Sequence, residues 1–415
     1  PDIDCPNANT QGTGSGASNY MVSCKGGLPN GFADIVAANG DKLLRSVPEV
    51  GLALVKTANP TAYEIGSCEV AEDLSMQMID PVQTVELDQE ANPPSAGDDE
   101  TYFWMQWGHD AVNAPEAWNA GVRGQCVRVA VLDTGFDLDH PDLLPNINFD
   151  LSQDFTGEGL QYTLSDPFSH GTHTAGTIAA ADNDWGSIGV APDAELVLLK
   201  VLGDEGSGSF FDLFDAIVYA AGEADVDVIN MSLGATICTG YHKAGLFVST
   251  MTRVVNYAKQ KGVVVIAAAG NDAYDLDHLW DCQHLPSDLA GVQSISATAP
   301  YGWAYELDPD LDVPASYTNY GQSTVAFAAP GGDFDFPYDY WWYDMVLSTG
   351  NGGWYWSAGT SMAAPHAAGI AALIISEGGN TSPAAVLSKM RKRADDLGKS
   401  GQDDYYGAGR VSSGY

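Results

Sequence analysis

Four polar residues in the second part of the chain are of the types that carry out nucleophilic catalysis. Asp133 ends the apolar run CVRVAVLD, His170 opens the alanine-rich stretch HGTHTAGTIAA, Asn271 ends AAAGN, and Ser361 stands in GTSMAAPH. A serine hydroxyl attacks a carbonyl when a base takes its proton, and a carboxylate holds that base in one tautomer. A side-chain amide can donate to the oxyanion that forms. Each residue alone suits a turn or a helix cap, but the four together predict hydrolysis by a serine nucleophile.

Other chemistries fit these motifs less well. His170 and His173 are three residues apart, but the Glu of H-E-x-x-H is missing, which argues against a zinc site. Position 363 is alanine, so the G-x-S-x-G turn is not met, and the order Asp, His, Ser differs from the Ser, Asp, His order of that fold. Gly359 permits a tight turn before a helix that begins near Ser361, and free N–H groups at a helix start favour an oxyanion.

The elements that must position these residues are predicted from about residue 101 onward. Short runs rich in Val, Ile and Ala alternate with helical stretches. The runs are apolar on both sides of the strand alternation, which is typical of strands covered on both faces. We therefore expect an α/β fold, doubly wound, with a mostly parallel sheet and helices on both faces. In such a fold ligands bind at the carboxyl ends of the strands.

The front of the chain has a different pattern. Residues 1–17 are polar and predict a flexible N-terminal segment, whereas 18–90 mix strand-like and helix-like pieces and predict a small α+β domain. Residues 91–100 form an acidic, proline-containing linker, a natural place for proteolytic processing. The catalytic domain is then expected over 101–415. The aromatic, acidic stretch DFDFPYDYWWYD (333–344) is predicted to be an insertion loop.

Composition narrows the choice of partners. The chain has 415 residues, with 55 Asp and Glu against 17 Lys and Arg, and a formal net charge of −38. A surface of that sign repels phosphate backbones and anionic membranes, so we expect no nucleic acid partner and no membrane binding. No apolar run reaches the roughly 18 residues that a membrane span needs. The acidity suits divalent cations, a saline medium or solubility, and composition does not choose among them.

The six cysteines include no C-x-x-C pair and have no histidine partners at zinc-finger spacing. An even count in an acidic chain favours disulfides, and hence secretion into an oxidising compartment, although several buried free thiols are the alternative. The pairings to test first are Cys5 with Cys24 and Cys238 with Cys282. No export signal stands at the start of this sequence.

Together these motifs resemble the subtilisin-like serine protease family (subtilases). DTGFDLDHPDL, HGTHTAG, AAAGN and GTSMAAPH match its four signatures, and the resemblance runs from about residue 107 to 373. It implies that Ser361 is the nucleophile, His170 the general base and then acid, and Asp133 the residue that orients it. Asn271 and the backbone N–H of Ser361 would form the oxyanion hole.

The same resemblance implies two walls that sandwich an extended polypeptide substrate as an added strand. The lining of the first side-chain pocket is small, apolar and uncharged, so we expect a preference for a large apolar residue before the cut. The substrate-binding residues implied in this way are Ser207, Gly208, Ser232, Leu233, Gly234, Ala235, Ala268 and Gly270.

The segment IAAADNDWGSIGVAP resembles the calcium loop of the family, and loop oxygens are the ligands that a hard cation takes. The alternative is an acidic surface turn. Asp98 or Asp99 could add a ligand from the linker. The implied calcium ligands are the Asp142 carboxylate, the Asn183 side chain and the carbonyls of Ala181, Trp185 and Ser187.

Residues 18–90 resemble, more weakly, the inhibitory propeptide of the family. The resemblance implies that this domain acts as an intramolecular inhibitor and folding template, with its tail in the active site and processing between about Leu87 and Asp99. A non-inhibitory accessory domain is the alternative. We therefore predict a secreted, monomeric, calcium-stabilised serine endopeptidase in its proenzyme form. The rival hypotheses are a narrow processing protease with the aromatic insertion as an exosite, and a binding protein with a dormant triad.

Overall fold

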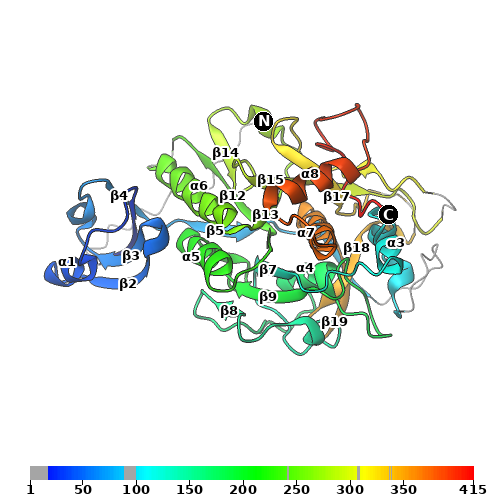
Figure 1. The fold of residues 1–415 in the computed structure, drawn as a ribbon, viewed down its shortest axis with the longest axis horizontal. Coiled ribbons are helices and arrows are strands. Elements are labelled where there is room, and N and C mark those ends of the chain that lie inside the picture. The colour runs from blue at the N-terminus through cyan, green and yellow to red at the C-terminus, as the bar shows by residue number, and fades with distance from the viewer. Residues whose placement is uncertain (1–16, 88–99, 241–242, 306–308, 336, 338) are drawn as a thin grey trace.

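A computed structural model describes residues 17–87, 100–240, 243–305, 309–335, 337 and 339–415 (Figure 1). The predicted flexible segment 1–17 lies outside these residues apart from its last member, as do Cys5 and all but one residue of the predicted linker 91–100. That one residue, Glu100, is buried.

The centre of the molecule is a mostly parallel sheet with strand order β16-β15-β13-β11-β7-β9-β8, and β17 pairs with β15. Only the pair β15·β16 of this sheet is antiparallel within the described residues. Its strands are β7 (Arg128–Asp133), β8 (Gln153–Asp154), β9 (Glu195–Lys200), β11 (Val228–Met231), β13 (Val264–Ala268), β15 (Val292–Ala299), β16 (Val313–Pro314) and β17 (Val325–Pro330).

Both faces of this sheet are covered, as the apolar runs predict. Along β7, Val129 and Val131 join the apolar cluster that contains α4 and α7, whereas Ala130 and Leu132 join the cluster that contains α5 and α6. Successive side chains of a strand point to opposite faces, so each face receives one cluster. The α-helices of the described residues are α1 (Phe32–Ala38), α2 (Trp107–Ala111), α3 (Ala114–Asn119), α4 (His170–Ala179), α5 (Phe210–Gly222), α6 (Ala244–Lys261), α7 (Thr360–Ser376) and α8 (Pro383–Arg393).

The strand order explains where the site forms. The chain moves from β7 to β9 on one side and then to β11 on the other side of β7. Adjacent connections therefore leave in opposite directions at β7, and an open α/β sheet has its ligand crevice at such a switch point, beyond the carboxyl ends of the strands. Asp133 is the last residue of β7 and lies at that point.

A second, antiparallel sheet with order β2-β3-β1-β4 is formed by the front of the chain (blue in Figure 1). One of its faces packs on α1, while residues of the other face, including Met21, Leu52 and Leu54, join the cluster of α5 and α6. Within the described residues this part has one α-helix, and the stretch VAEDLSMQMI contributes to strands instead. Its strands are β1 (Ser18–Cys24), β2 (Lys42–Val47), β3 (Leu52–Thr57) and β4 (Cys68–Glu72).

Two smaller sheets join the front segment to the rest of the chain. Strand β5 lies between β10 and β12, which also pairs with β14, and β6 pairs with β19, which pairs with β18. In Figure 1, β5 runs from the blue sheet into the body of the molecule. The strands concerned are β5 (Ser75–Met78), β6 (Gln83–Glu86), β10 (Ser207–Ser209), β12 (Leu233–Cys238), β14 (Cys282–Leu285), β18 (Val346–Gly350) and β19 (Gly353–Ala358).

The disulfides and the aromatic stretch agree only in part with the predictions. The pairing of Cys238 with Cys282 is confirmed, but Cys24 pairs with Cys68, so the prediction of Cys5 with Cys24 is wrong. The reason is that β1 and β4 are neighbours, and their register sets Cys24 opposite Cys68. The aromatic stretch is not wholly a loop, since Trp341–Asp344 form a short 3-10 helix in which Tyr343 and Asp344 are buried. No helix in the described residues is both long and apolar enough for a membrane span.

Candidate active site

Asp133 and His170 are joined by a short hydrogen bond at the carboxyl end of the sheet. His170 Nδ1 lies 2.6 Å from Asp133 Oδ1, and both side chains are buried. The carboxylate also accepts from the Thr134 N–H (2.8 Å) and from the Thr174 hydroxyl (3.1 Å), one helical turn beyond His170. These bonds fix the proton on Nδ1, so Nε2 carries the lone pair that a base needs.

Ser361 is the second residue of α7, and its surroundings are set by a proline four residues later. Pro365 has no N–H, so the Ser361 carbonyl lacks the usual helical partner. The Ser232 hydroxyl donates to that carbonyl instead, at 2.8 Å. This bond ties the start of α7 to Ser232, a predicted substrate-binding residue. The start of the helix therefore stays in place beside the predicted cleft.

The side chain of Asn271 is oriented by Thr360. Asn271 Oδ1 accepts from both the backbone N–H (2.9 Å) and the hydroxyl (2.8 Å) of Thr360, and the Thr360 hydroxyl accepts from the Gly270 N–H at 3.0 Å. Two donors on one oxygen settle which end of the amide is Nδ2. That NH₂ group donates to the Asp80 carbonyl at 2.9 Å, so it faces the polypeptide in the cleft.

A strand of the protein's own front segment occupies the predicted substrate cleft. In β5, Gln77 is opposite Ser207 of β10 and also opposite Gly234 of β12, both antiparallel. Two further pairs, Gly208 with Met76 and Leu233 with Met78, lie on either side. The structure thus brings together the two predicted walls around an extended strand, which binds through main-chain hydrogen bonds.

The reacting atoms meet this strand at two successive carbonyl groups. The Ile79 N–H donates to the Ser232 carbonyl at 3.3 Å, and the Ser361 hydroxyl donates to the Ile79 carbonyl at 2.7 Å. The Asn271 amide bonds the next carbonyl, that of Asp80. His170 Nε2 is buried and has no hydrogen-bond partner among the described residues. Ser361 and Asn271 therefore donate hydrogen bonds to the carbonyls of two successive residues rather than to the same carbonyl.

The chain continues uncut beyond this point. Pro81 follows Asp80, and the Val82 N–H donates to the Ala358 carbonyl at 2.8 Å. Strand β6 then pairs with β19 in the register Gln83 with Ala358 through Glu86 with Tyr355. The cleft is filled on both sides of Ser361, as by an intact polypeptide. The segment that contacts Ser361 therefore lies upstream of the predicted processing region between about Leu87 and Asp99. Only Leu87 of that region lies within the described residues.

The remaining predicted pocket residues lie on or next to strands β12 and β13. Ala268 ends β13 and is fully buried, Gly270 has φ +102° just before Asn271, and Ala235 is opposite Leu285 of β14. A side chain at Gly270 would be strained at that φ and would come within 2.3 Å of Asn319. Behind Gly234 and Gly270 lies His284, which the sequence analysis did not single out.

Two buried carboxylates accept hydrogen bonds from the predicted calcium loop. Asp142 Oδ2 accepts from the Ser187 N–H and the Trp354 Nε1–H, both at 2.8 Å, and Glu100 Oε1 accepts from the Asn183 N–H at 3.1 Å. The second oxygen of each carboxylate, Asp142 Oδ1 and Glu100 Oε2, is buried without a hydrogen-bond partner in the described part of the chain.

This loop fits a hard cation, because buried carboxylate oxygens without partners are costly and a cation would satisfy them. Of the other predicted ligands, Ala181 is buried and Trp185 is 51% exposed. Three carboxylate, histidine or cysteine side chains do not meet here or elsewhere in the described ranges, so a cation would depend on backbone and amide oxygens as well. Glu100 is the carboxylate on the linker side of this loop among the described residues, whereas Asp98 and Asp99 lie outside them.

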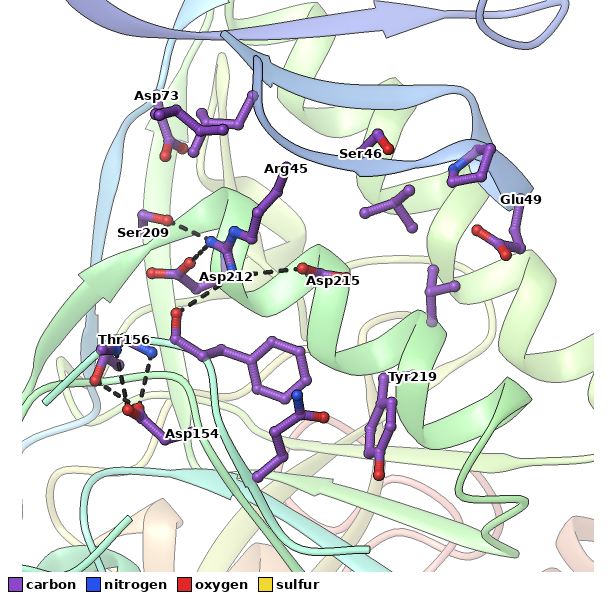
Figure 2. A pocket seen from close by; sticks show the side chains of 18 of the residues that line it. Arg45, Ser46, Glu49, Asp73, Asp154, Thr156, Ser209, Asp212, Asp215 and Tyr219 are labelled. Carbon is purple, nitrogen blue, oxygen red and sulfur yellow. Dashed lines mark hydrogen bonds and ion pairs between the residues drawn. The ribbon is translucent and has the colours of Figure 1, made fainter. Parts of the chain in front are cut away.

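A cavity of about 760 Å³ lies between the front sheet and the body of the molecule and is lined by residues of both (Figure 2). Arg45 of β2 points into it and pairs with Asp212 and, at 3.3 Å, with Asp215, both on α5. Asp73 accepts from the Phe211 N–H at 3.2 Å. Burial raises the pKa of Asp73 to about 7 and that of Asp215 to about 6. The contact between the front segment and α5 thus brings three acids, Asp73, Asp212 and Asp215, close to the one base Arg45 among these residues.

Sequence reasoning missed the supporting residues Thr174 and Thr360 and the pocket residue His284. Thr174 lies four residues after His170, on the same face of its helix, and a search for that spacing would have found it. His284 was recognisable only through the predicted Cys238–Cys282 pair, whose antiparallel register places residue 284 opposite Thr236.

The fold and site together define a serine peptidase with a doubly wound α/β body. The family model for the subtilase family (Peptidase_S8) matches residues 124–409. The chain is 33% identical over 388 residues to M-protease of Shouchella clausii (92% of this chain, 86% of the relative). It is 36% identical over 312 residues to subtilisin Savinase of Lederbergia lenta (74% and 97%). The chain belongs to the subtilase family, and it is a subtilisin-type serine protease.

Among solved structures, the epidermin leader peptide processing serine protease of Staphylococcus aureus superposes with a TM-score of 0.78. The identity is 22%, and the match covers 96% of this chain and 97% of that one. At this identity the likeness concerns the fold. Since it spans almost the whole of both chains, it includes the front segment as well as the α/β body.

Proposed function

We propose that this protein is a secreted endopeptidase in its proenzyme form, in which Ser361 is the nucleophile, His170 the base and Asp133 the orienting carboxylate. The single observation that carries the proposal is the strand Ser75–Glu86, which crosses the cleft in extended form with a carbonyl on the Ser361 hydroxyl. A peptide bond held there is the substrate that such a set of residues hydrolyses.

The proposed reaction starts when the Ser361 hydroxyl rotates from the Ile79 carbonyl oxygen toward Nε2 of His170. Oγ attacks the carbonyl carbon while its proton passes to Nε2, and Asp133 stabilises the imidazolium. The oxyanion accepts from Asn271 Nδ2 and the Ser361 N–H. His170 then protonates the leaving amine, the C–N bond breaks, and water cleaves the acyl-enzyme by the same steps in reverse order.

The bond we propose for self-processing is Ile79–Asp80. The carbonyl on Ser361 is that of Ile79, and the Ile79 N–H is held by the Ser232 carbonyl. The next bond, Asp80–Pro81, would release the secondary amine of a proline, whose ring adds bulk beside Ser361. The front domain, residues 18–72, is then the inhibitor, and the strand that follows it is the tail in the active site.

Calcium, the cation that subtilases commonly bind, is proposed for the loop around Asp142. Asp142, Glu100 and Asn183 would hold it with the carbonyls of Ala181, Trp185 and Ser187, and it would supply structural stability rather than chemistry at the site. Secretion is supported by the two disulfides, because such bonds persist in oxidising compartments.

The decisive experiment is the intact mass of the purified chain over time, with and without Ser361→Ala. The proposal expects the unchanged chain to give two fragments, one ending at Ile79, and the variant to stay whole. Removal of such a nucleophile costs roughly 10⁶ in turnover. Fragments of the same mass from Ser361→Ala would overturn the assignment, because another group would then be cutting the chain.

A further inference from the structure

His284 lies behind β12, one of the two walls that hold the bound strand. It is on β14, opposite Thr236 of β12, and it is 5% exposed. Strand β12 thus has the bound strand β5 on one side and His284's strand on the other. A side chain on β14 is therefore placed one strand behind the polypeptide in the cleft.

The edge of the imidazole ring lies between Gly234 of β12 and Gly270, which follows β13. A Cβ atom built on Gly234 would be 2.8 Å from Cε1 of His284, and one built on Gly270 would be 3.1 Å from Nε2. Gly234 pairs with Gln77 of the bound strand, and Gly270 immediately precedes Asn271. The ring therefore closes the far end of the space between the walls, which is where the side chain before the cut must enter.

Hydrogen bonds at the other ring nitrogen fix the chemistry of this edge. The Ser287 hydroxyl donates to the His284 carbonyl at 3.2 Å, so its oxygen is the acceptor for Nδ1–H at 2.8 Å. Nε2 then carries a lone pair. Burial lowers the pKa of His284 to about 4, although the charge of Asp272 raises it. At neutral pH the ring is uncharged and offers an acceptor to the space between the glycines.

The residue held at this position is of modest size. Ile79 precedes the proposed cut, is 8% exposed, and belongs to the same apolar cluster as Ala268, a predicted pocket residue at the end of β13. An isoleucine is shorter than a phenylalanine or tyrosine, and a buried pocket that ends in a rigid ring cannot lengthen to take one.

On the basis of the proposed peptidase function, we infer that His284 is the floor of the pocket for the side chain before the cut. It restricts that side chain to aliphatic groups of about the size of Ile79. Aromatic side chains are excluded by the bulk of the ring. Carboxylates are excluded because the floor presents a lone pair and no donor, which leaves a buried charge unpaired. The sequence predicted a preference for any large apolar residue before the cut, and the preference inferred from His284 is narrower.

The test compares hydrolysis of peptides that differ only in the residue before the cut, which is Ile, Phe or Glu, by the self-processed protein. The unchanged enzyme should give a higher kcat/KM with Ile than with Phe or Glu. His284→Gly should raise the ratio of Phe to Ile by about tenfold or more, since one or two methylene-sized groups in such a pocket are worth 10- to 200-fold. His284→Ser serves in the same way if the glycine variant does not accumulate.

Each outcome bears on the inference. A preference of the unchanged enzyme for Phe over Ile, or a Phe-to-Ile ratio that stays within twofold in the variants, overturns it. Loss of all Ser361-dependent hydrolysis in the unchanged enzyme would instead refute the proposed function. The matched control is His278→Gly, because the His278 side chain is 80% exposed at the end of a short 3-10 helix and pairs with Asp275. That variant should leave the ratio unchanged.

Discussion

The hydroxyl of Ser361 donates its hydrogen bond to the carbonyl oxygen of Ile79, 2.7 Å away, while the amide of Asn271 bonds the carbonyl of the next residue, Asp80. For attack on one carbonyl carbon, the nucleophile and the oxyanion donor must serve the same group. At Asn271 the bound strand therefore presents the carbonyl of Asp80, whereas the carbonyl of Ile79 must reach this amide before it reacts. An intact strand in this position blocks the cleft until it shifts.

The first prediction concerns the residues that orient the oxyanion donor. Asn271→Leu should lower kcat by about 10²- to 10³-fold with a smaller effect on KM, because the lost hydrogen bond forms fully only in the transition state. Thr360→Val keeps the shape but removes the hydroxyl that bonds Asn271 Oδ1 at 2.8 Å, so it should lower kcat by a smaller factor. Steady-state kinetics with one peptide measures both. A rise in KM with kcat unchanged would contradict this role.

The second prediction concerns the residue before the proposed cut. Ile79 is buried, so Ile79→Glu would place a charge in an apolar pocket and should slow self-cleavage by at least about tenfold, equivalent to 1.4 kcal/mol. The measurement is a time course of intact mass. Gln77→Glu is the matched control, because Gln77 is exposed on the same strand and should not alter the rate. Equal rates for both variants would place the cut elsewhere.

The fold class and the active-site motifs were predictable because each depends on local pattern. Strands apolar on both faces, separated by helices, allow few arrangements, and Asp133 had to lie at a strand end because its run ends there. The disulfide between Cys238 and Cys282, which lies in the α/β body, was also predicted. The strand order that places Asp133 at the switch point could not be predicted in this way, because it depends on which strands pair in the folded sheet.

What could not be predicted depends on contacts between distant segments. The bond that meets Ser361 follows from the register of β5 between two walls, and register is set by pairing partners that the sequence does not name. The disulfide of Cys24 with Cys68 depends on β1 and β4 being neighbours. His284 approaches Gly234 and Gly270 only after β12 and β14 pair, so its role had no local signal.

The third prediction concerns the cation. Chelation by EDTA should lower the melting temperature, because Asp142 Oδ1 and Glu100 Oε2 are left buried without partners. A cation at 100 times its Kd stabilises a protein by about 2.7 kcal/mol. Glu100→Gln should weaken the calcium dependence, and Asp404→Asn, an exposed acid elsewhere, should not. A melting temperature that calcium and EDTA leave unchanged would argue against a cation at this loop. A control with sodium at the same ionic strength distinguishes calcium binding from screening of the protein's charges.

The fourth prediction concerns the contact between the front domain and α5. The pKa of Asp73 is raised by burial to about 7 and that of Asp215 to about 6, from an ordinary value of 3.8. Between pH 4 and 7 the docked state therefore holds more protons than the separated state, so the stability of the contact falls as pH rises through this window. Above about pH 7 both states are ionised, and below about pH 4 both are protonated, so the contact changes little there.

Several groups face these two acids, and the sign of the prediction takes them into account. Arg45 lowers both pKa values, whereas Asp212 raises both, and Glu49 and Glu223 raise that of Asp215. The one guanidinium that pairs with α5 does not cancel the burial of the acids, so their proton affinity stays high.

Hydrogen exchange of the Ser361→Ala chain, which should not cut itself, measures this effect at the amides of β2 and the start of α5. Protection there should decline from pH 4 to pH 7 once the intrinsic pH dependence of exchange is subtracted. Asp73→Asn should reduce the decline, because the amide oxygen can still accept from the Phe211 N–H but does not titrate. Asp34→Asn, at an exposed site on α1, is the control. Protection that rises with pH would show that ion pairing by Arg45 outweighs the desolvation of the acids.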